Sequence, residues 1–408
     1  MINHLITKTT LVLIGIIVFS ACTLIQVENE KVNETKSANK ETITEKVELK
    51  KIPKDMPVEF ERVWQTWEIL RKEHLDKDTI TAEQMSQAAV EGMLKSLDDR
   101  YASYMDKTAT NRLAEELRGS YQGIGASVSL RNNQIVIVEP FPNSPAKKAG
   151  IEAGDIVLAI NGQPTMGMNL QEAVALVRGP EGTSVELTVK HQGANATSET
   201  ITVIRGEIKV SSTRLEITDE NYGYLIIKSF SNETDDQVAK LLKEAQSKKV
   251  HAIIIDLRNN LGGTVDSVLN ISNEFIDGGL IFYSIDSDKN RRNYVANKGG
   301  SFTTKPIVVL VNPFSASASE VLAGTLQQNR NATIIGTKTY GKGNVGIFHE
   351  LNEKDGINFS IAAWYLPNGD RIEEDGIEPD INPATEDTTN PGDIVYNKAI
   401  EVLNKLFK

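Results

Sequence analysis

The sequence has few of the residues on which disulfide and metal chemistry depend. Its 408 residues include one cysteine, so no disulfide can form within the chain. The five histidines are His4, His74, His191, His251 and His349. Because none has His-x-x-x-His spacing or cysteine neighbours, the sequence predicts no metal site and argues against a zinc peptidase. We interpret His251 as a structural residue inside a buried strand and His349 as one near another strand.

Acidic residues outnumber basic ones, 55 to 44. The formal net charge of −11 argues against a nucleic-acid partner. The tripeptide Gly341-Lys342-Gly343 lacks the rest of a phosphate-binding loop, so we expect neither a nucleotide nor another cofactor. The chain is nevertheless long enough for two or three domains with substantial cores.

What the sequence does contain is a serine-rich turn in its C-terminal half. The apolar run Ile307–Val311 predicts a strand, the residues from Glu320 to Leu326 predict a helix, and Ser317 lies between them. A serine hydroxyl becomes a good nucleophile when a neighbouring base takes its proton. A lysine such as Lys342 can be that base if burial lowers its pKa from about 10.4. Ser317 and Glu320 also fit a plain helix-capping box, and this alternative stays open here.

A second loop carries potential backbone donors. The strand pattern Val250–Asp256 runs into the pair Gly262-Gly263, which precedes an apolar helical stretch, Val265–Phe275. Glycines let a backbone approach a ligand closely, and N–H groups at the start of a helix, such as that of Ala318, can face an oxyanion. A simple strand-to-helix turn would also account for the glycine pair.

Together these segments resemble the carboxy-terminal processing peptidases, also called tail-specific proteases. The resemblance runs from about Pro57 to the C-terminus and is carried, in order, by residues 256–263, 315–324, 336–343 and 376–380. It implies a serine endopeptidase with a Ser-Lys dyad that cleaves near protein C-termini. By motif position, Ser317 is the nucleophile and Lys342 the general base. Gly263 and Ala318 supply the oxyanion N–H groups.

Two positions depart from this family. A glutamine usually stands four residues after the lysine, where this chain has Gly346, and Leu261 replaces a common proline. If residues 342–346 form a strand, Asn344 shares a face with Lys342 and its amide is a candidate substitute for the glutamine.

Between residues 119 and 206, strand patterns alternate with turns at 132–133 and 161–162, and residues 170–177 have helical spacing. This order resembles a PDZ domain, a β-rich module with two helices that binds the C-terminus of a peptide. The resemblance implies that the terminal carboxylate is bound by the loop of Gly123, Ile124 and Gly125. It also implies that Arg178 couples the domain to the active site; a solvated surface arginine is the alternative.

The N-terminus predicts export. The apolar run Leu11–Phe19 is too short for a convincing membrane span, and Ser20-Ala21-Cys22 follows it. This pattern resembles a bacterial lipoprotein signal that is cleaved before Cys22, where the lipid is attached. An uncleaved anchor is the alternative. Both interpretations place the protein on the extracytoplasmic side of the cell membrane, in the periplasm or at the cell surface.

We therefore expect a multidomain α/β protein. The predicted segments are a signal peptide (1–21), a flexible tether (22–56), an N-terminal helical region (57–118), a PDZ domain (119–206), a serine peptidase core with a mixed sheet and flanking helices (207–390), and a C-terminal helix (391–408). The predicted partners are proteins or peptides with free C-termini, the membrane through Cys22 and, as an open option, further copies of the chain in a homo-oligomer. The alternative function is a PDZ-containing binding or scaffold protein whose peptidase was silenced by loss of the glutamine.

Overall fold

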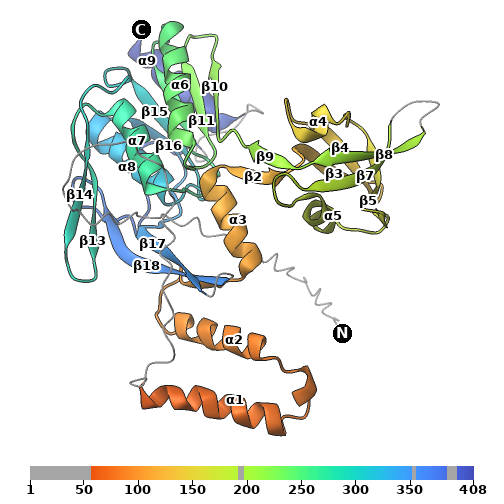
Figure 1. Ribbon diagram of the computed structural model, residues 1–408. Helices are drawn as coiled ribbons and strands as arrows, with labels where there is room; N and C mark the ends of the chain where they lie inside the picture. Colours follow the sequence, from red (N-terminus) through yellow and green to blue (C-terminus); the bar gives the residue numbers. More distant parts are fainter. Residues whose placement is uncertain (1–56, 192–196, 352–354, 384–392) are drawn as a thin grey trace, which may run out of the picture.

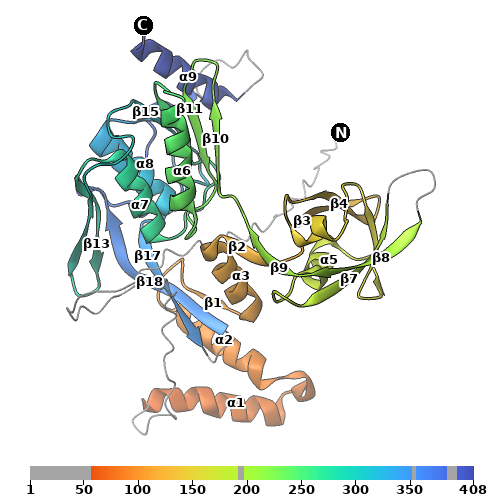
Figure 2. The same ribbon diagram turned by 45° about the horizontal axis from the view of Figure 1, so that its top comes forward.

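The computed structural model describes residues 57–191, 197–351, 355–383 and 393–408. They form a helical N-terminal hairpin, a small β-rich domain and a larger α/β core, which Figure 1 shows as separate parts of the molecule. The turned view in Figure 2 keeps the same three parts apart. The predicted fold class is confirmed. The predicted signal peptide and tether, with Cys22, lie outside the described residues.

The core is built on a five-stranded mixed sheet. Its strands, in spatial order, are β10 (Thr213–Ile217), β11 (Gly223–Ile227), β12 (Ile253–Asp256), β15 (Ile307–Val311) and β16 (Thr333–Gly336). β10 runs antiparallel to β11, whereas the other neighbours are parallel. The carboxyl ends of β12, β15 and β16 therefore lie at one edge of the sheet. These three strands are followed by the glycine loop (257–263), the serine turn (315–319) and the lysine loop (337–343), respectively. The topology therefore brings all three segments to that edge.

Helices cover both faces of this sheet (Figure 1). Ile253 and Ile255 belong to the apolar core that contains α6 (Thr234–Ser247), α7 (Val265–Phe275) and α8 (Ala318–Arg330). Ile254 belongs instead to the cluster with α9 (Ile394–Leu406). Alternate residues of a strand face opposite sides, so β12 is apolar throughout because helices bury both of its faces.

A second, antiparallel sheet lies beside the core and was not predicted from the sequence pattern. It contains β1 (Ser103–Met105), β18 (Asp355–Tyr365), β13 (Gly279–Asp286) and β14 (Arg291–Ala296), with β17 (Asn344–Leu351) paired to β18. This sheet matters for the site because β17 begins two residues after Lys342. β1 begins two residues after Tyr101, so the sheet also draws the N-terminal region against the lysine loop.

The PDZ-like domain is joined to the rest by a two-stranded ribbon. Its strands are β3 (Ala126–Arg131), β4 (Gln134–Pro140), β5 (Ile156–Ile160), β6 (Gln163–Pro164), β7 (Ser184–Lys190) and β8 (Ser198–Ile204), and its helices are α4 (Pro145–Lys148) and α5 (Leu170–Val177). The chain enters through β2 (Ser120–Gly123) and leaves through β9 (Gly206–Lys209), which pair antiparallel. The predicted carboxylate loop directly follows β2, at the junction with this ribbon.

The N-terminal hairpin presents an apolar surface to solvent. It comprises the short 3₁₀ helices η1 (Val58–Phe60) and η2 (Lys77–Thr79) and the α-helices α1 (Glu61–Glu73) and α2 (Ala82–Lys95); α3 (Lys107–Arg118) then leads to β2. α1 has no fully buried residue, and Trp64 is 64% exposed. Trp67 and Leu70 are half-buried, so within the described part of the chain the apolar face of α1 is only partly covered. Among those same residues, no helix has both the length and the apolar character needed to cross a membrane.

The predicted placement of His251 inside a buried strand is wrong. His251 is exposed and lies two residues before β12, not within a buried strand. Its N–H donates to the carbonyl of Asn221, and its ring packs 5.8 Å from that of Phe407. The apolar pattern misled because the chain still turns at this point and joins the sheet only from Ile253. His349 lies in β17, as expected near a strand, and stacks on Phe359.

Candidate active site

Ser317 has an unusual backbone conformation at the junction of β15 and α8. The residue is completely buried, with φ of 56° and ψ of −116°. An ordinary N-cap residue has extended dihedral angles with negative φ. A non-glycine residue in the conformation of Ser317 is strained by about 1–3 kcal/mol and persists only where its surroundings hold it, commonly at functional sites. The capping box with Glu320 is present, since its carboxylate accepts from the Ser317 N–H, but a plain capping role does not account for this backbone conformation.

The two neighbouring serines hold the turn against the glycine loop. The hydroxyl of Ser315 donates to the carbonyl of Leu257 (2.8 Å), and that of Ser319 donates to the carbonyl of Asn260 (2.8 Å). The N–H of Ala316 also donates to the Asn260 carbonyl, at 3.0 Å. The hydroxyls of Ser315 and Ser319 thus serve the packing of two loops, which favours Ser317 as the reactive serine.

The glycine pair touches the serine turn. Gly262 has φ of 104°, and a β-carbon there would lie 2.8 Å from Cβ of Ser317 and 3.1 Å from N of Ala318. Gly263 has φ of 150°, and a β-carbon there would overlap the carbonyl oxygen of Phe230 at 2.1 Å. Glycine is required at both positions. Gly262 therefore contacts the first turn of α8, which puts the predicted oxyanion donor Gly263 one residue from the contact with Ala318, the other predicted donor.

One buried carboxylate joins the serine turn to the lysine loop. Oε2 of Glu320 accepts hydrogen bonds from the backbone N–H groups of Ser317 (2.8 Å) and Lys342 (2.8 Å). Oε1 accepts from the N–H of Gly341 (2.6 Å) and the hydroxyl of Thr339 (2.6 Å). Burial raises the pKa of this carboxyl, and the four donors partly offset the shift. The backbones of Ser317 and Lys342 are thus fixed to the same oxygen atom.

Residues distant in sequence also contact the lysine loop. Lys342 is 4% exposed, and its Nζ lies 5.1 Å from the centre of the Tyr101 ring. The hydroxyl of Tyr101 lies 3.2 Å from the carbonyl oxygen of Gly341 and 3.3 Å from a carboxylate oxygen of Glu373. The same carboxylate oxygen accepts from the N–H of Gly343 at 2.8 Å. Burial raises the pKa of Tyr101, so its hydroxyl stays neutral and can donate.

Tyr101 and Glu320 had no assigned role at this site on sequence grounds. Glu320 was visible only as half of a capping box. The available signal for Tyr101 is that the segment Arg100–Tyr104 resembles the family sequence just before the PDZ domain. The contacts of both side chains with the lysine loop depend on tertiary structure.

Asn344, the predicted substitute for the glutamine, lies next to Arg371. β17 begins at Asn344, so Lys342 precedes the strand and the alternation of faces does not extend to it. Oδ1 of Asn344 lies 3.5 Å from the guanidinium of Arg371. Gly346 follows within β17 and has no side chain to offer.

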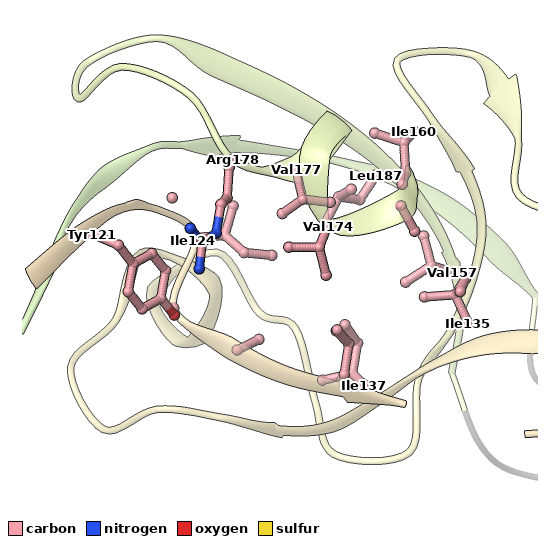
Figure 3. A pocket seen from close by; sticks show the side chains of 15 residues that line it. Tyr121, Ile124, Ile135, Ile137, Val157, Ile160, Val174, Val177, Arg178 and Leu187 are labelled. Atoms are coloured by element: carbon pink, nitrogen blue, oxygen red, sulfur yellow. The ribbon is translucent and has the colours of Figure 1, made fainter. Parts of the chain in front are cut away.

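The four residues predicted to bind substrate line one cavity in the β-rich domain. Gly123, Ile124, Gly125 and Arg178 border a space of about 210 Å³ that also touches strands β3 to β5 and helix α5. Figure 3 shows Arg178 and Tyr121 at one end of the cavity and aliphatic side chains along the rest. This arrangement suits a peptide tail with a charged end and an apolar side chain.

Arg178 also connects this cavity to α3. Its guanidinium forms an ion pair with Glu115 (2.8 Å) and lies 4.7 Å from the centre of the Tyr121 ring. The Arg178 side chain is 42% exposed, so the ion pair contributes at most about 1 kcal/mol to stability. The significance of the pair lies in its position, since Arg178 lies between the cavity and the helix that precedes the ribbon.

These features define a class of protein. The α/β core presents a buried serine on a strained turn, a buried lysine and two backbone donors at one sheet edge, and a second domain offers an apolar cavity beside a glycine loop and an arginine. Among the described residues, no group of three or more potential ligands could hold a metal ion. The class is a serine hydrolase with a peptide-binding module.

Comparisons with known proteins give the family. The profile of peptidase family S41 matches residues 221–382, that of a PDZ domain matches 136–191, and that of the activating protease CtpB N-terminal domain matches 13–109. The chain is 33% identical over 328 residues to carboxy-terminal processing protease CtpA of Bacillus subtilis, covering 80% of this chain and 70% of that protein. It is 37% identical over 298 residues to the carboxy-terminal-processing protease of Bartonella bacilliformis, covering 72% and 68%. The chain belongs to peptidase family S41, as a serine peptidase of the carboxy-terminal processing type.

A solved structure from Bacteroides fragilis shares the fold. It aligns with a TM-score of 0.51 and 18% identity and covers 83% of this chain and 96% of that one. At this level of identity the likeness concerns the fold alone.

We expect Glu320→Ala to lower both stability and activity. The substitution leaves three backbone N–H groups and a hydroxyl without their acceptor, and each unsatisfied buried group costs about 1–3 kcal/mol. Thermal unfolding should show a fall in Tm of about 2–4 °C per kcal/mol. The matched control is Glu378→Ala, because the Glu378 side chain is 74% exposed and its removal should change Tm little. Equal Tm values for the two variants would contradict the role of Glu320.

Proposed function

We propose that this chain is a membrane-tethered, extracytoplasmic serine endopeptidase that cleaves proteins near their C-termini after its PDZ domain has captured the substrate tail. The observation that carries the proposal is the shared acceptor, Oε2 of Glu320, for the N–H groups of Ser317 and Lys342. Because one oxygen binds both backbones, the nucleophile and the amine belong to a single constellation.

In this proposal Lys342 acts as the general base. Its neutral amine takes the proton of the Ser317 hydroxyl while Oγ attacks the scissile carbonyl, and the resulting ammonium gives that proton to the leaving amine. The N–H groups of Gly263 and Ala318 donate to the oxyanion. Water then attacks the acyl-enzyme with Lys342 again as base, which releases the shortened protein and restores the serine.

Tail capture is assigned to the cavity beside Gly123, Ile124 and Gly125. The N–H groups of this loop bind the terminal carboxylate, and the aliphatic walls take an apolar side chain. A bound carboxylate competes with Glu115 for the guanidinium of Arg178, so that occupancy of the cavity alters a contact on α3. The relatives' names, which describe carboxy-terminal processing, support a substrate presented by its tail.

The membrane tether rests on the N-terminal sequence. Leu11–Phe19 and the following Cys22 support a lipid anchor on the extracytoplasmic side, as the sequence predicts. Self-association also stays a prediction, and the exposed apolar face of α1 supports it.

Substitution of the dyad tests the proposed chemistry. Ser317→Ala and Lys342→Ala should each abolish cleavage of an unstructured protein that ends in apolar residues. Mass spectrometry of the products measures this cleavage. Ser315→Ala is the matched control. It removes a hydroxyl of the same turn that bonds Leu257, so it should retain cleavage with lower stability.

Two results would contradict this assignment. If Ser315→Ala is inactive while Ser317→Ala still cleaves, the assignment of Ser317 as the nucleophile is wrong. A wild-type protein that binds tails but cleaves none would favour the silenced scaffold.

Arg178→Ala tests the coupling of tail and active site. Loss of a charge-assisted hydrogen bond costs about 1.5–3 kcal/mol, so kcat/KM for a substrate with a free C-terminus should fall about tenfold or more. A substrate with an amidated C-terminus should be cleaved slowly by wild type and variant alike. Arg131→Ala, at an exposed position of the same domain, is the control. If Arg178→Ala and Arg131→Ala behave alike, Arg178 is a solvated surface residue.

Cys22→Ser tests the anchor. In a bacterial host fed a labelled fatty acid, the wild-type protein should incorporate the label and sediment with membranes, because the thiol is the proposed attachment site. The variant should remain unlabelled. Equal labelling of both proteins would refute lipidation at Cys22.

A further inference from the structure

Asn358 is a buried amide with one free end. The residue lies in β18 and is 1% exposed. Its Nδ2 donates to the carbonyl oxygen of Tyr101 (3.0 Å), whereas its Oδ1 has no hydrogen-bond partner among the described residues. Because a carbonyl oxygen can only accept, the bond to Tyr101 fixes which end of the amide is which. An unpaired buried acceptor is uncommon in folded proteins and calls for an explanation.

The free oxygen occupies space beside Gly346. A β-carbon at Gly346 would lie 3.0 Å from Oδ1 of Asn358. Gly346 belongs to β17, which pairs with β18 next to this point. The region next to position 346 is therefore filled by an amide from the neighbouring strand, and the glycine leaves room for it.

Tyr101 contacts both this amide and the lysine. Tyr101, whose carbonyl binds Asn358, has Nζ of Lys342 5.1 Å from its ring centre. Tyr101, Lys342 and Asn358 are all buried. The three residues thus form one cluster, assembled from the N-terminal region, the lysine loop and β18.

We propose that Asn358 is the positioning residue for Lys342. Its Oδ1, which has no partner among the described residues of the resting structure, accepts a hydrogen bond from Nζ when the amine is protonated during acyl transfer, and so orients the amine toward Ser317. The inference rests on the proposed function of Lys342. It explains the unpaired oxygen and the glycine at 346 together. Asn344 is engaged elsewhere, with its Oδ1 next to Arg371.

The first experiment compares steady-state kinetics of Asn358→Ala with those of Asn293→Ala, an exposed asparagine of the same sheet. Loss of one hydrogen bond that orients the base should lower kcat about two- to tenfold and leave KM unchanged. Asn293→Ala should leave both unchanged. A purely structural role for Asn358 would lower Tm without changing kcat of the folded protein, and that result would overturn the proposal. A larger loss of kcat in Asn344→Ala than in Asn358→Ala would do the same.

Rescue gives a sharper test. In the wild-type background Gly346→Gln should not raise kcat, because its β-carbon meets Oδ1 of Asn358. In the Asn358→Ala background the space is open, and the new carboxamide should restore most of the lost kcat. Gly346→Gln is thus expected to raise kcat only when Asn358 is absent, and a double-mutant cycle of the two positions should show strong coupling. Equal effects of Gly346→Gln in the two backgrounds would refute the shared position.

A readout that needs no turnover separates this inference from the proposed function. The rate of Lys342 acetylation by acetic anhydride, followed by mass spectrometry across pH, reports the protonation of its amine. Removal of an acceptor that stabilises the ammonium should lower the midpoint in Asn358→Ala relative to wild type. An unchanged midpoint refutes the inference even if the enzyme is active. A shifted midpoint in a protein that cleaves nothing supports the contact and rejects the peptidase.

Discussion

The site depends on a single buried carboxylate. Glu320 lies in the first turn of α8 and receives hydrogen bonds from the serine turn and from three residues of the lysine loop. Parallel strands deliver these loops to one edge of the sheet, but a strand end does not specify where a loop of several residues places its side chains. The carboxylate provides that specification, because both of its oxygens must be satisfied once they are removed from water.

Further contacts link the lysine loop to the PDZ domain. Glu373 and Tyr101 also contact the lysine loop. Tyr101 lies two residues before β1, and the chain continues from β1 to α3 and the PDZ ribbon. Arg178 bonds to α3 from the other end of that path. Contacts and the chain between them therefore link the cavity of the PDZ domain to the lysine loop. The path consists of the Arg178–Glu115 ion pair, the chain from α3 back to Tyr101, and the contact of the Tyr101 hydroxyl with the carbonyl of Gly341.

Much of the architecture followed from local pattern. The apolar runs predicted β15 at Ile307–Val311 and α7 at Val265–Phe275, and both elements have those bounds. Burial on both faces makes such strands uniformly apolar, which is a strong signal. The antiparallel sheet of β13, β14, β17 and β18 was not predicted, since its strands mix polar and apolar residues and their pairing is set by distant segments.

The sequence by itself determined the order of domains, the residue types available for chemistry and the serine, lysine and glycine segments that carry them, because these depend on short-range spacing. Tertiary structure alone decided which groups meet. Glu320 binds two loops, and Asn358 approaches Gly346 from the neighbouring strand. The strained conformation of Ser317 likewise depends on contacts with other loops. No periodicity along the chain encodes such contacts, since each arises only when the sheets pack.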